Sequence, residues 1–274
     1  MKRVRISPLV AAFLASAAVF AGVLAWLLAD RATGRGDALK TAGLAGGAVA
    51  ALYGLWLNDR RRRVEEDRHD LERSRISDER FAKSVELLGH DADQVRVGAI
   101  HALGGVARTR PETYTQTVLD VLCAYLRRPF QHPELEEVDD PAAAERELQA
   151  RRTAQRVIRS LLPDAGSDGP AYSLDLSGAS LDRFSLSGKE VGLLGAQRTT
   201  IVNGASFTDT SFSGSVFFTG ASVRGPVEFV RTRFGSGTGF RDFTVHDAVT
   251  FSEVTFALPP DFSQARFPAG TELP

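Results

Sequence analysis

The C-terminal part of the chain carries phenylalanine at every eleventh position, six times in succession. A second series of Phe and Val recurs equally often and begins five positions after the first. The two series are Phe207, Phe218, Phe229, Phe240, Phe251 and Phe262, and Phe212, Val223, Phe234, Val245, Phe256 and Phe267. An internal repeat of this kind indicates an architecture in which each unit buries its apolar face only against its neighbours.

The residues around each apolar position favour short strands rather than helices. Small or β-branched residues often stand two positions before the large apolar one, as Val227 does before Phe229, so that both point to the same side of a strand. Gly, Ser, Thr and Pro fill the gaps, which disfavours an amphipathic helix. If two repeat units close one coil, residues 171–270 make nearly five coils, and the strand spacing gives a column about 24 Å long.

Upstream of these units, an apolar residue at every fifth position identifies the type of coil. Leu176, Leu181 and Leu186 follow this spacing, with Leu174, Ala179 and Phe184 two positions earlier. The pattern is similar to the A(D/N)LxX motif of pentapeptide-repeat proteins. That resemblance implies a right-handed quadrilateral β-helix over residues 172–270, with the central Leu or Phe filling the lumen. Residues 187–203 fit the motif poorly, so a distorted or interrupted coil is expected there.

The N-terminal part has the apolar length of a transmembrane hairpin. Residues 6–29 contain no charge, and a helix of this length would span about 36 Å. A second uncharged segment, residues 41–58, is near the lower limit for a membrane span. A cleaved signal peptide is the alternative, and the length of the first segment and the presence of the second disfavour it. Residues 1–58 are therefore predicted to be a transmembrane hairpin that contacts lipid through residues 6–58.

Basic residues predict the orientation of this hairpin. Seven of them flank its two ends, namely Lys2, Arg3, Arg5 and residues 60–63, against three in the connection, so both termini are expected in the cytoplasm and the hairpin in the plasma membrane. The single cysteine, Cys123, fits a reducing compartment. Gly43 and Gly47 form GxxxG, which favours packing of the hairpin against itself and leaves a homo-oligomer as the alternative.

Between the hairpin and the repeats, the sequence predicts helices. Residues 59–80 carry eight basic and eight acidic side chains, typical of a solvated juxtamembrane helix. Residues 81–162 show helical periodicity, with Asp91 and Gln94 as a capping pair, a helix after Pro111, and another that Asp140 caps and that ends at Pro163. Residues 163–171 are rich in Pro, Gly and Asp and predict a linker.

The helical segment also resembles a known module. The run RFAKSVELLGHDADQVRVGAIHALGGVA, followed by VLCAYLRR, is similar to the helical module behind the membrane hairpin of many bacterial pentapeptide-repeat proteins. This module is similar to a HEAT unit, whose stacked helix pairs expose a groove for partners. One departure is Gly104–Gly105, where that family has a charged or bulkier pair. Together the resemblances imply a multidomain membrane protein: a transmembrane α-hairpin, an all-α HEAT-like module and a pentapeptide-repeat β-helix.

No catalytic, cofactor-binding or metal-ligating set is predicted, and no cofactor. The carboxylates of residues 130–140 match no calcium loop, so a solvated loop is expected. FGSGTGF at 234–240 lacks the strand-to-helix context of a phosphate loop and is interpreted as a corner of the repeat. Cys123 has no activating base in the pattern and is assigned to packing, and His101 is interpreted as a surface or hydrogen-bonded histidine rather than a ligand.

Charge narrows the function classes. Overall there are 33 basic and 34 acidic residues, which disfavours a nucleic-acid partner. The expected function is a non-enzymatic, membrane-tethered scaffold that binds a cytoplasmic protein. Two alternatives stay open: an enzyme with an unrecognised site, and a DNA-mimicking regulator of a type II topoisomerase. The mimic needs a strongly negative column, but residues 171–274 carry 8 basic and 10 acidic groups.

Overall fold

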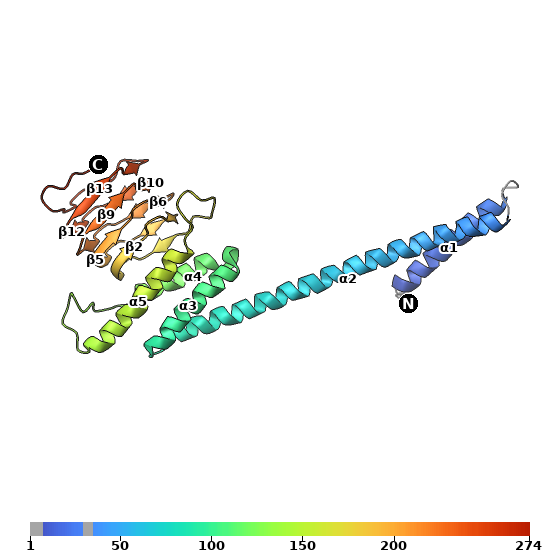
Figure 1. The fold of residues 1–274 in the computed structure, drawn as a ribbon, viewed down its shortest axis with the longest axis horizontal. Helices are drawn as coiled ribbons and strands as arrows, with labels where there is room; N and C mark the ends of the chain where they lie inside the picture. Colours follow the sequence, from blue (N-terminus) through green and yellow to red (C-terminus); the bar gives the residue numbers. More distant parts are fainter. Residues whose placement is uncertain (1–7, 30–34) are drawn as a thin grey trace, which may run out of the picture. The chain divides into compact units, whose positions relative to one another are not determined.

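The computed structural model describes residues 8–29 and 35–274, and contacts divide the chain into two compact units, Met1–Ile76 and Ser77–Pro274. Helix α1 spans Pro8–Ala29, and α2 runs without interruption over Arg35–Leu88 (Figure 1). The second apolar segment, the charged segment 59–80 and the first helical turns after it are therefore parts of one helix. The predictions that involve residues 1–7 and 30–34, including the basic residues at the N-terminus, lie outside the described residues.

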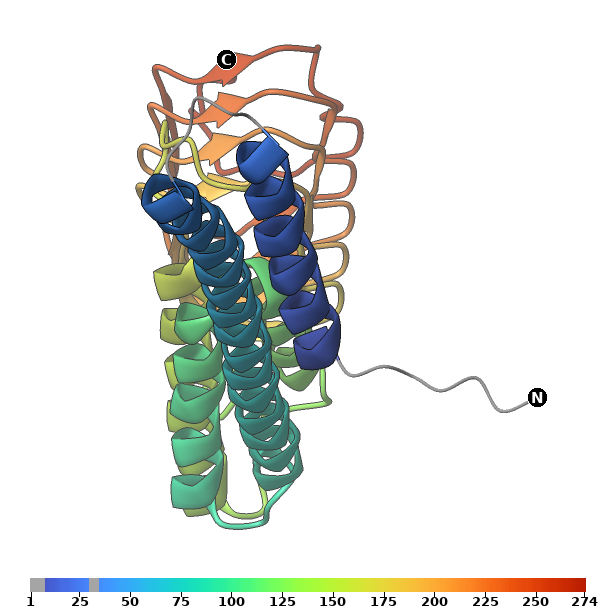
Figure 2. The ribbon, with the colours of Figure 1, turned by 90° about the vertical axis from the view of Figure 1, so that its right-hand side faces the viewer.

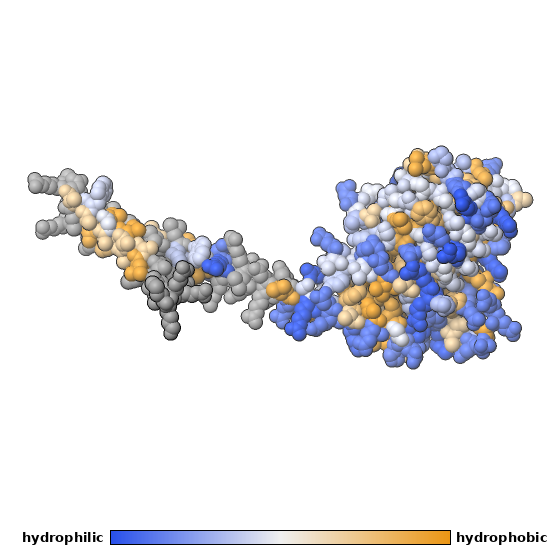
Figure 3. All heavy atoms as spheres, turned by 180° about the vertical axis from the view of Figure 1, so that it is seen from behind, coloured by the Kyte–Doolittle hydropathy of each residue, from blue (hydrophilic) through white to orange (hydrophobic). Residues whose placement is uncertain are grey.

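Large apolar side chains are exposed on the described part of α1 and the first half of α2 (Figure 3). Trp26 and Leu44 are 75% and 76% exposed, and Leu14, Leu55 and Trp56 are also more than half exposed. Within the described residues, no helix combines the length and the apolar character that crossing a membrane requires. The transmembrane hairpin stays a prediction.

Three further helices belong to the second unit: α3 (Asp93–Thr109), α4 (Pro111–Leu126) and α5 (Pro141–Leu161). Asp140 caps α5 as predicted, because its Oδ1 accepts a hydrogen bond of 2.9 Å from the backbone N–H of Ala143. The predicted cap at Asp91 is wrong. Helix α3 begins later, with Ala92 at the N-cap and no side-chain cap, and the N–H of Ala92 instead donates to Nδ1 of His90 at 3.0 Å.

Helices α3 and α5 pack closely at Gly104, the first residue of the pair Gly104–Gly105. A Cβ atom at this position would lie 2.9 Å from Cγ1 of Val157, which is closer than carbon atoms pack. At Gly105 the same atom would meet nothing within 4 Å. Gly104 thus serves the close approach of the two helices, whereas Gly105 lies on the surface.

Residues from Leu174 onward form a parallel β-solenoid, built from short strands in three sheets (Figures 1 and 2). The strands are β1 (Leu174–Asp175), β2 (Ser180–Ser185), β3 (Glu190–Val191), β4 (Leu194–Gly195), β5 (Thr200–Ser206), β6 (Ser211–Phe212), β7 (Val216–Phe217), β8 (Ser222–Val223), β9 (Val227–Val230), β10 (Arg233–Phe234), β11 (Thr238–Gly239), β12 (Thr244–Val245), β13 (Val249–Ser252) and β14 (Thr255–Phe256). All paired strands run parallel. The expected β-solenoid is confirmed.

The registers confirm the predicted coil size but not the number of coils. Leu174 pairs with Leu194, Leu194 with Val216, and Val216 with Thr238, so each later turn has the length of two repeat units and the first is slightly shorter. Paired strands extend from Leu174 to Phe256, which makes about four turns rather than nearly five. Beyond Phe256 the chain adds only isolated bridges, such as Gly239 with Asp261, so the last segment does not complete a further turn of strands.

Equivalent phenylalanines of successive turns stack face to face, as the repeat predicts. Phe229 stacks on Phe251 with ring centroids 5.1 Å apart and an interplanar angle of 5°, and Phe234 stacks on Phe256 at 4.8 Å and 4°. Neighbouring rings along the chain meet edge to face, as Phe229 and Phe240 do at 85°. Both geometries are favourable for aromatic pairs, so the lumen is a continuous aromatic core.

The coil is distorted at the end of residues 187–203, where the pairing of β2 with β5 shifts register between Val202 and Ala205, but it is not interrupted there. Strand β3 pairs with β6, and β4 pairs with both β1 and β7, so the coil continues through this segment. The five-position spacing also continues, because Val191, Ala196 and Ile201 follow Leu186 and are buried. Smaller side chains at these positions conceal the repeat in the sequence without breaking it.

The first turn of the solenoid packs on the helices. Leu174, Leu176 and Leu181 are fully or almost fully buried in one apolar core that also contains Leu122 of α4 and Ile158 of α5. Figure 1 shows α5 next to β2, with later turns stacked away from the helices. One end of the β-solenoid is therefore covered by the helices, and segment 163–171 joins two parts of a single compact unit.

Two adjacent phenylalanines provide a test of the aromatic core. Phe218 is buried and stacks on Phe240 at 5.5 Å, whereas Phe217 points to the other side of β7 and is partly exposed. We expect Phe218→Ala to lower the free energy of unfolding by about 3–5 kcal/mol, because it leaves a cavity in the lumen. Phe217→Ala should cost less than about 1 kcal/mol. Urea unfolding of the full chain, followed by circular dichroism, measures both, and equal losses would contradict the stacked lumen.

Candidate functional site

The junction between α5 and the first turn of the solenoid centres on Asp182 of β2, whose side chain is completely buried. Its Oδ2 accepts a hydrogen bond from Nε of Arg152 at 2.6 Å, and its Oδ1 accepts one from Nδ2 of Asn203 at 2.8 Å. Its backbone oxygen accepts a third, from Nε2 of Gln155 at 3.2 Å. These bonds tie α5, β2 and β5 together.

The electrostatics of this junction follow from burial and pairing. Burial alone would raise the pKa of Asp182, but the hydrogen bonds from Arg152 and Asn203, together with the positive charge of Arg152, outweigh it, so this pKa lies below its usual value. The same hydrogen bond from Arg152 raises the pKa of that arginine. The carboxylate is therefore held in its charged form within a low-dielectric junction.

His132 approaches the same carboxylate from the segment between α4 and α5. Its side chain is buried, its Nδ1 accepts a hydrogen bond from the backbone N–H of Glu134, and its Nε2 lies 3.5 Å from Oδ1 of Asp182. This distance exceeds a hydrogen bond. The predicted solvated loop is thus correct for the exposed carboxylates, but one end of it, at His132, is anchored in the core.

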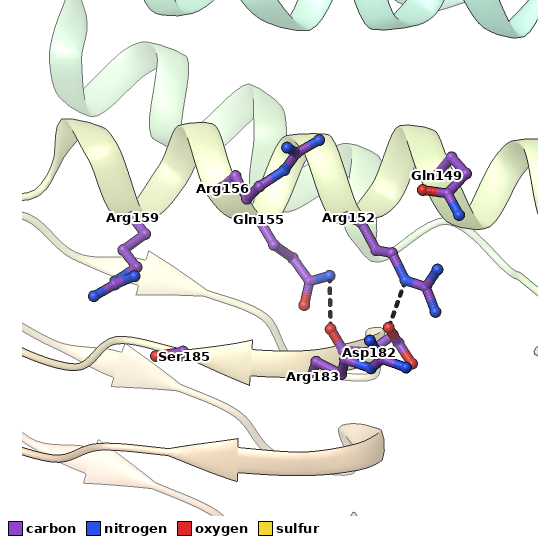
Figure 4. Close-up of a pocket in the computed structure, with 8 residues that line it drawn as sticks. All are labelled: Gln149, Arg152, Gln155, Arg156, Arg159, Asp182, Arg183 and Ser185. Atoms are coloured by element: carbon purple, nitrogen blue, oxygen red, sulfur yellow. Dashed lines mark hydrogen bonds and ion pairs between the residues drawn. The ribbon is translucent and has the colours of Figure 1, made fainter.

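A cleft of about 360 Å³ opens next to this junction (Figure 4). Helix α5 contributes one wall and β2 the other. The lining residues are Gln149, Arg152, Gln155, Arg156, Arg159, Asp182, Arg183 and Ser185. Four arginines against one aspartate give the lining a net charge of three positive units, since four minus one is three.

The arginines of the cleft are only partly engaged by the protein. Arg156 donates one bond to Oγ1 of Thr153 at 2.9 Å, and Arg159 donates one to the backbone oxygen of Ser187 at 2.9 Å. A guanidinium has five N–H donors, so both groups retain most of them. Arg183 is exposed, lies within β2 where the pairing with β5 shifts register, has a φ of 47°, and projects beside Asp182 (Figure 4). The arrangement can receive an anion.

Helix α5 brings its arginines together because of their spacing. Arg152, Arg156 and Arg159 stand at i, i+4 and i+7, which places them along one face, while Ile158 faces the core. No role is predicted for this face from the sequence. The spacing of the three arginines was the available signal, but nothing in the sequence indicated that β2 would bring Arg183 opposite them.

The residues that the sequence pattern singles out do not line this cleft. Cys123 is buried, and burial is the main cause that raises its pKa to about 12, which agrees with a packing role. His101 is exposed on α3, as expected. FGSGTGF begins in β10 and reaches β11, so it forms a corner of the solenoid. Among the described residues, no group of three or more His, Cys, Asp or Glu side chains is arranged to hold a metal ion.

Comparison of the chain with protein-family models, with curated proteins and with solved structures finds no match.

The buried carboxylate predicts how stability depends on pH. Because the folded-state pKa of Asp182 is lowered, its contribution is fully present above the unfolded-state pKa of about 3.9 and is lost as the pH falls through the folded-state value. At pH 7 we expect Asp182→Asn to cost on the order of 2–3 kcal/mol, and this difference from the wild type should shrink below about pH 4. Urea unfolding between about pH 7 and pH 3 measures it.

Asp242→Asn serves as the control, because Asp242 is an exposed corner residue of the solenoid. It should leave the unfolding free energy within about 0.5 kcal/mol of the wild type. A deficit for Asp182→Asn that stays constant across the same pH range would contradict the proposed charge state of the junction.

Proposed function

We propose that this protein is a non-enzymatic scaffold, attached to the cytoplasmic face of the plasma membrane, that presents its helices and β-solenoid as a rigid surface to a cytoplasmic protein. The observation that carries the proposal is the stacking of equivalent phenylalanines in successive turns, such as Phe207 on Phe229 at 5.0 Å and 8°. A lumen filled in this way fixes each turn relative to the next, so outward side chains stand at constant spacing. A preformed surface binds with a small loss of conformational entropy.

One row of outward corner residues illustrates such a surface. Asp209, Arg231 and Glu253 occupy equivalent corners in successive turns, each with a positive φ. Arg231 donates to both carboxylate oxygens of Asp209, at 2.6 and 2.7 Å, although both side chains are about half exposed. The row alternates in charge, which suits a protein partner with complementary charges. It offers no continuous acidic stripe, and this disfavours the DNA-mimic alternative.

The finer classification of the fold is part of the same proposal. The apolar residue at every fifth position and the length of the turns support a right-handed quadrilateral β-helix of the pentapeptide-repeat type. Helices α3, α4 and α5, with the end of α2, correspond to the HEAT-like module of that architecture. In this scheme residues 1–58 are the hairpin, 59–80 the charged helix, 81–162 the module, 163–171 the linker and 172–270 the β-helix.

Membrane attachment is supported by the sequence and by exposure. Residues 6–29 carry no charge, and the described apolar side chains of this region, including Trp26 and Leu44, are largely exposed. Exposed apolar surface of this extent is favourable in contact with lipid. Seven basic residues at the ends of the hairpin support a cytoplasmic location for both termini.

Cysteine labelling tests the attachment and its orientation. Cys123 gives little background, because it is buried and its pKa is raised to about 12. A membrane-impermeant maleimide should label Thr33→Cys in intact cells, but Ala248→Cys, on the exposed surface of the solenoid, only after lysis. Labelling of Ala248→Cys in intact cells would contradict the orientation. Release of the full chain from membranes by alkaline carbonate, without detergent, would contradict the attachment.

Proximity labelling tests the scaffold. A labelling enzyme fused to the full chain should enrich reproducible protein neighbours over the same enzyme fused to an unrelated membrane hairpin. We expect Arg231→Glu to reduce this enrichment several-fold, because it makes the row of Asp209 and Glu253 uniformly acidic. Arg198→Glu is the matched control, since Arg198 is also an exposed corner residue with positive φ but lies outside that row. Finding no enriched neighbour would contradict the scaffold.

A further inference from the structure

We infer that the cleft between α5 and β2 is a binding site for a small organic phosphate that carries a hydroxyl or amino donor. The inference goes beyond the scaffold proposal and does not depend on membrane attachment. It rests on three independent features of the cleft: its charge, a buried acceptor without a partner, and its size.

The charge of the cleft favours a phosphate over other small ligands. Asp182 is already paired with Arg152 at 2.6 Å, which leaves Arg156, Arg159 and Arg183 as uncompensated charges around the opening. Guanidinium groups match phosphate oxygens because their planar donors form two parallel hydrogen bonds. Three of the four arginines come from α5 and Arg183 comes from β2, so both walls of the cleft carry positive charge (Figure 4). A bound phosphate would relieve the repulsion that remains.

The unpartnered Oε1 of Gln155 indicates that the ligand carries a hydrogen-bond donor. Gln155 is 9% exposed, and its Oε1 is buried in the cleft wall without a hydrogen-bond partner. The orientation of the amide is fixed, because Nε2 donates to the backbone oxygen of Asp182 at 3.2 Å and a flipped amide would place two oxygens together. A buried acceptor without a donor costs free energy. A hydroxyl or amino group of a ligand in the cleft would satisfy it.

The size of the cleft limits the ligand. A volume of about 360 Å³ is at the lower end of the range for small-molecule sites. This volume suits a sugar phosphate or a nucleoside monophosphate, and a lipid headgroup offers the same chemistry. Ser185 and Gln149 add neutral polar groups at the rim for further hydroxyls.

Calorimetry on the full chain, purified in a nonionic detergent, tests the site with defined probes. Adenosine monophosphate and glycerol 3-phosphate carry both a phosphate and hydroxyl donors, and adenosine and glycerol lack the phosphate. We expect at least one of the two phosphates to bind with a dissociation constant below about 1 mM, and the uncharged pair to show no binding. No binding of either phosphate up to about 10 mM would overturn the proposal.

Three variants separate the features of the site. Arg183→Gln and Arg159→Gln should each weaken binding about tenfold, because each removes a charge-assisted hydrogen bond. Arg198→Gln is the matched control: Arg198 is an exposed residue with a φ of 53°, like Arg183 with 47°, but it does not line the cleft. Equal weakening by Arg183→Gln and Arg198→Gln would overturn the site, since it would indicate attraction by the overall charge alone.

Gln155→Leu tests the donor. It removes the buried acceptor, so it should lower the affinity for glycerol 3-phosphate severalfold and change the affinity for inorganic phosphate little. An equal effect on both probes would overturn the role of Gln155. The unfolding midpoint without ligand checks that each variant is folded.

A comparison with a lipid tests whether the bound phosphate belongs to a soluble molecule or to a lipid headgroup. Dioctanoyl phosphatidylglycerol and its deacylated headgroup, glycerophosphoglycerol, are compared in the same assay. Equal affinities support a soluble phosphate, and tighter binding of the lipid supports a headgroup. Binding of either that resists Arg183→Gln overturns the assignment to this cleft.

Discussion

Face-to-face contact between phenylalanine rings one turn apart is the interaction on which the second unit depends. Each short strand of the solenoid, often only a dipeptide, has too few backbone hydrogen bonds to be stable alone. The stacked rings of Phe212, Phe234 and Phe256, with centroids 5.2 and 4.8 Å apart, bury the lumen and hold the strands in register. This core sets the spacing of the outward side chains, including the row of Asp209, Arg231 and Glu253.

The helices cover the apolar first turn at one end of the solenoid. A first turn without a cover would expose the leucines that fill it, and repeat proteins need such a cover for solubility. Helices α4 and α5 provide it, and Asp182 supplies the polar part of the same contact by binding Arg152 and Asn203. The packing of α5 against β2 joins the helices to the solenoid. The same packing forms the arginine-lined cleft, because these two elements are its walls.

Sequence alone predicts much of this architecture because the signals are periodic. Phenylalanine at every eleventh position predicts stacked repeat units, the resemblance to pentapeptide repeats implies two units in each turn, and two helix starts follow from Pro111 and the Asp140 cap. The failures have local causes. Val191 and Ala196 fill the lumen with small side chains and so hide the repeat, while His90, not Asp91, satisfies the N–H group before α3. The cleft could not be predicted, because α5 and β2, which carry Arg159 and Arg183, come together only through the packing of distant segments.

The turn length restricts how such a chain can grow or shorten. Equivalent positions of successive turns pair, as Phe212 does with Phe234, but the side-chain pattern repeats twice within that length, once in each half turn. Inserting a single repeat unit would keep large apolar residues in the interior, yet it would rotate every later face by half a circumference. If the insertion fell between Asp209 and Arg231, that arginine would then stand opposite the aspartate rather than above it. Only the insertion of an even number of repeat units would leave the outward side chains of later turns on their original faces.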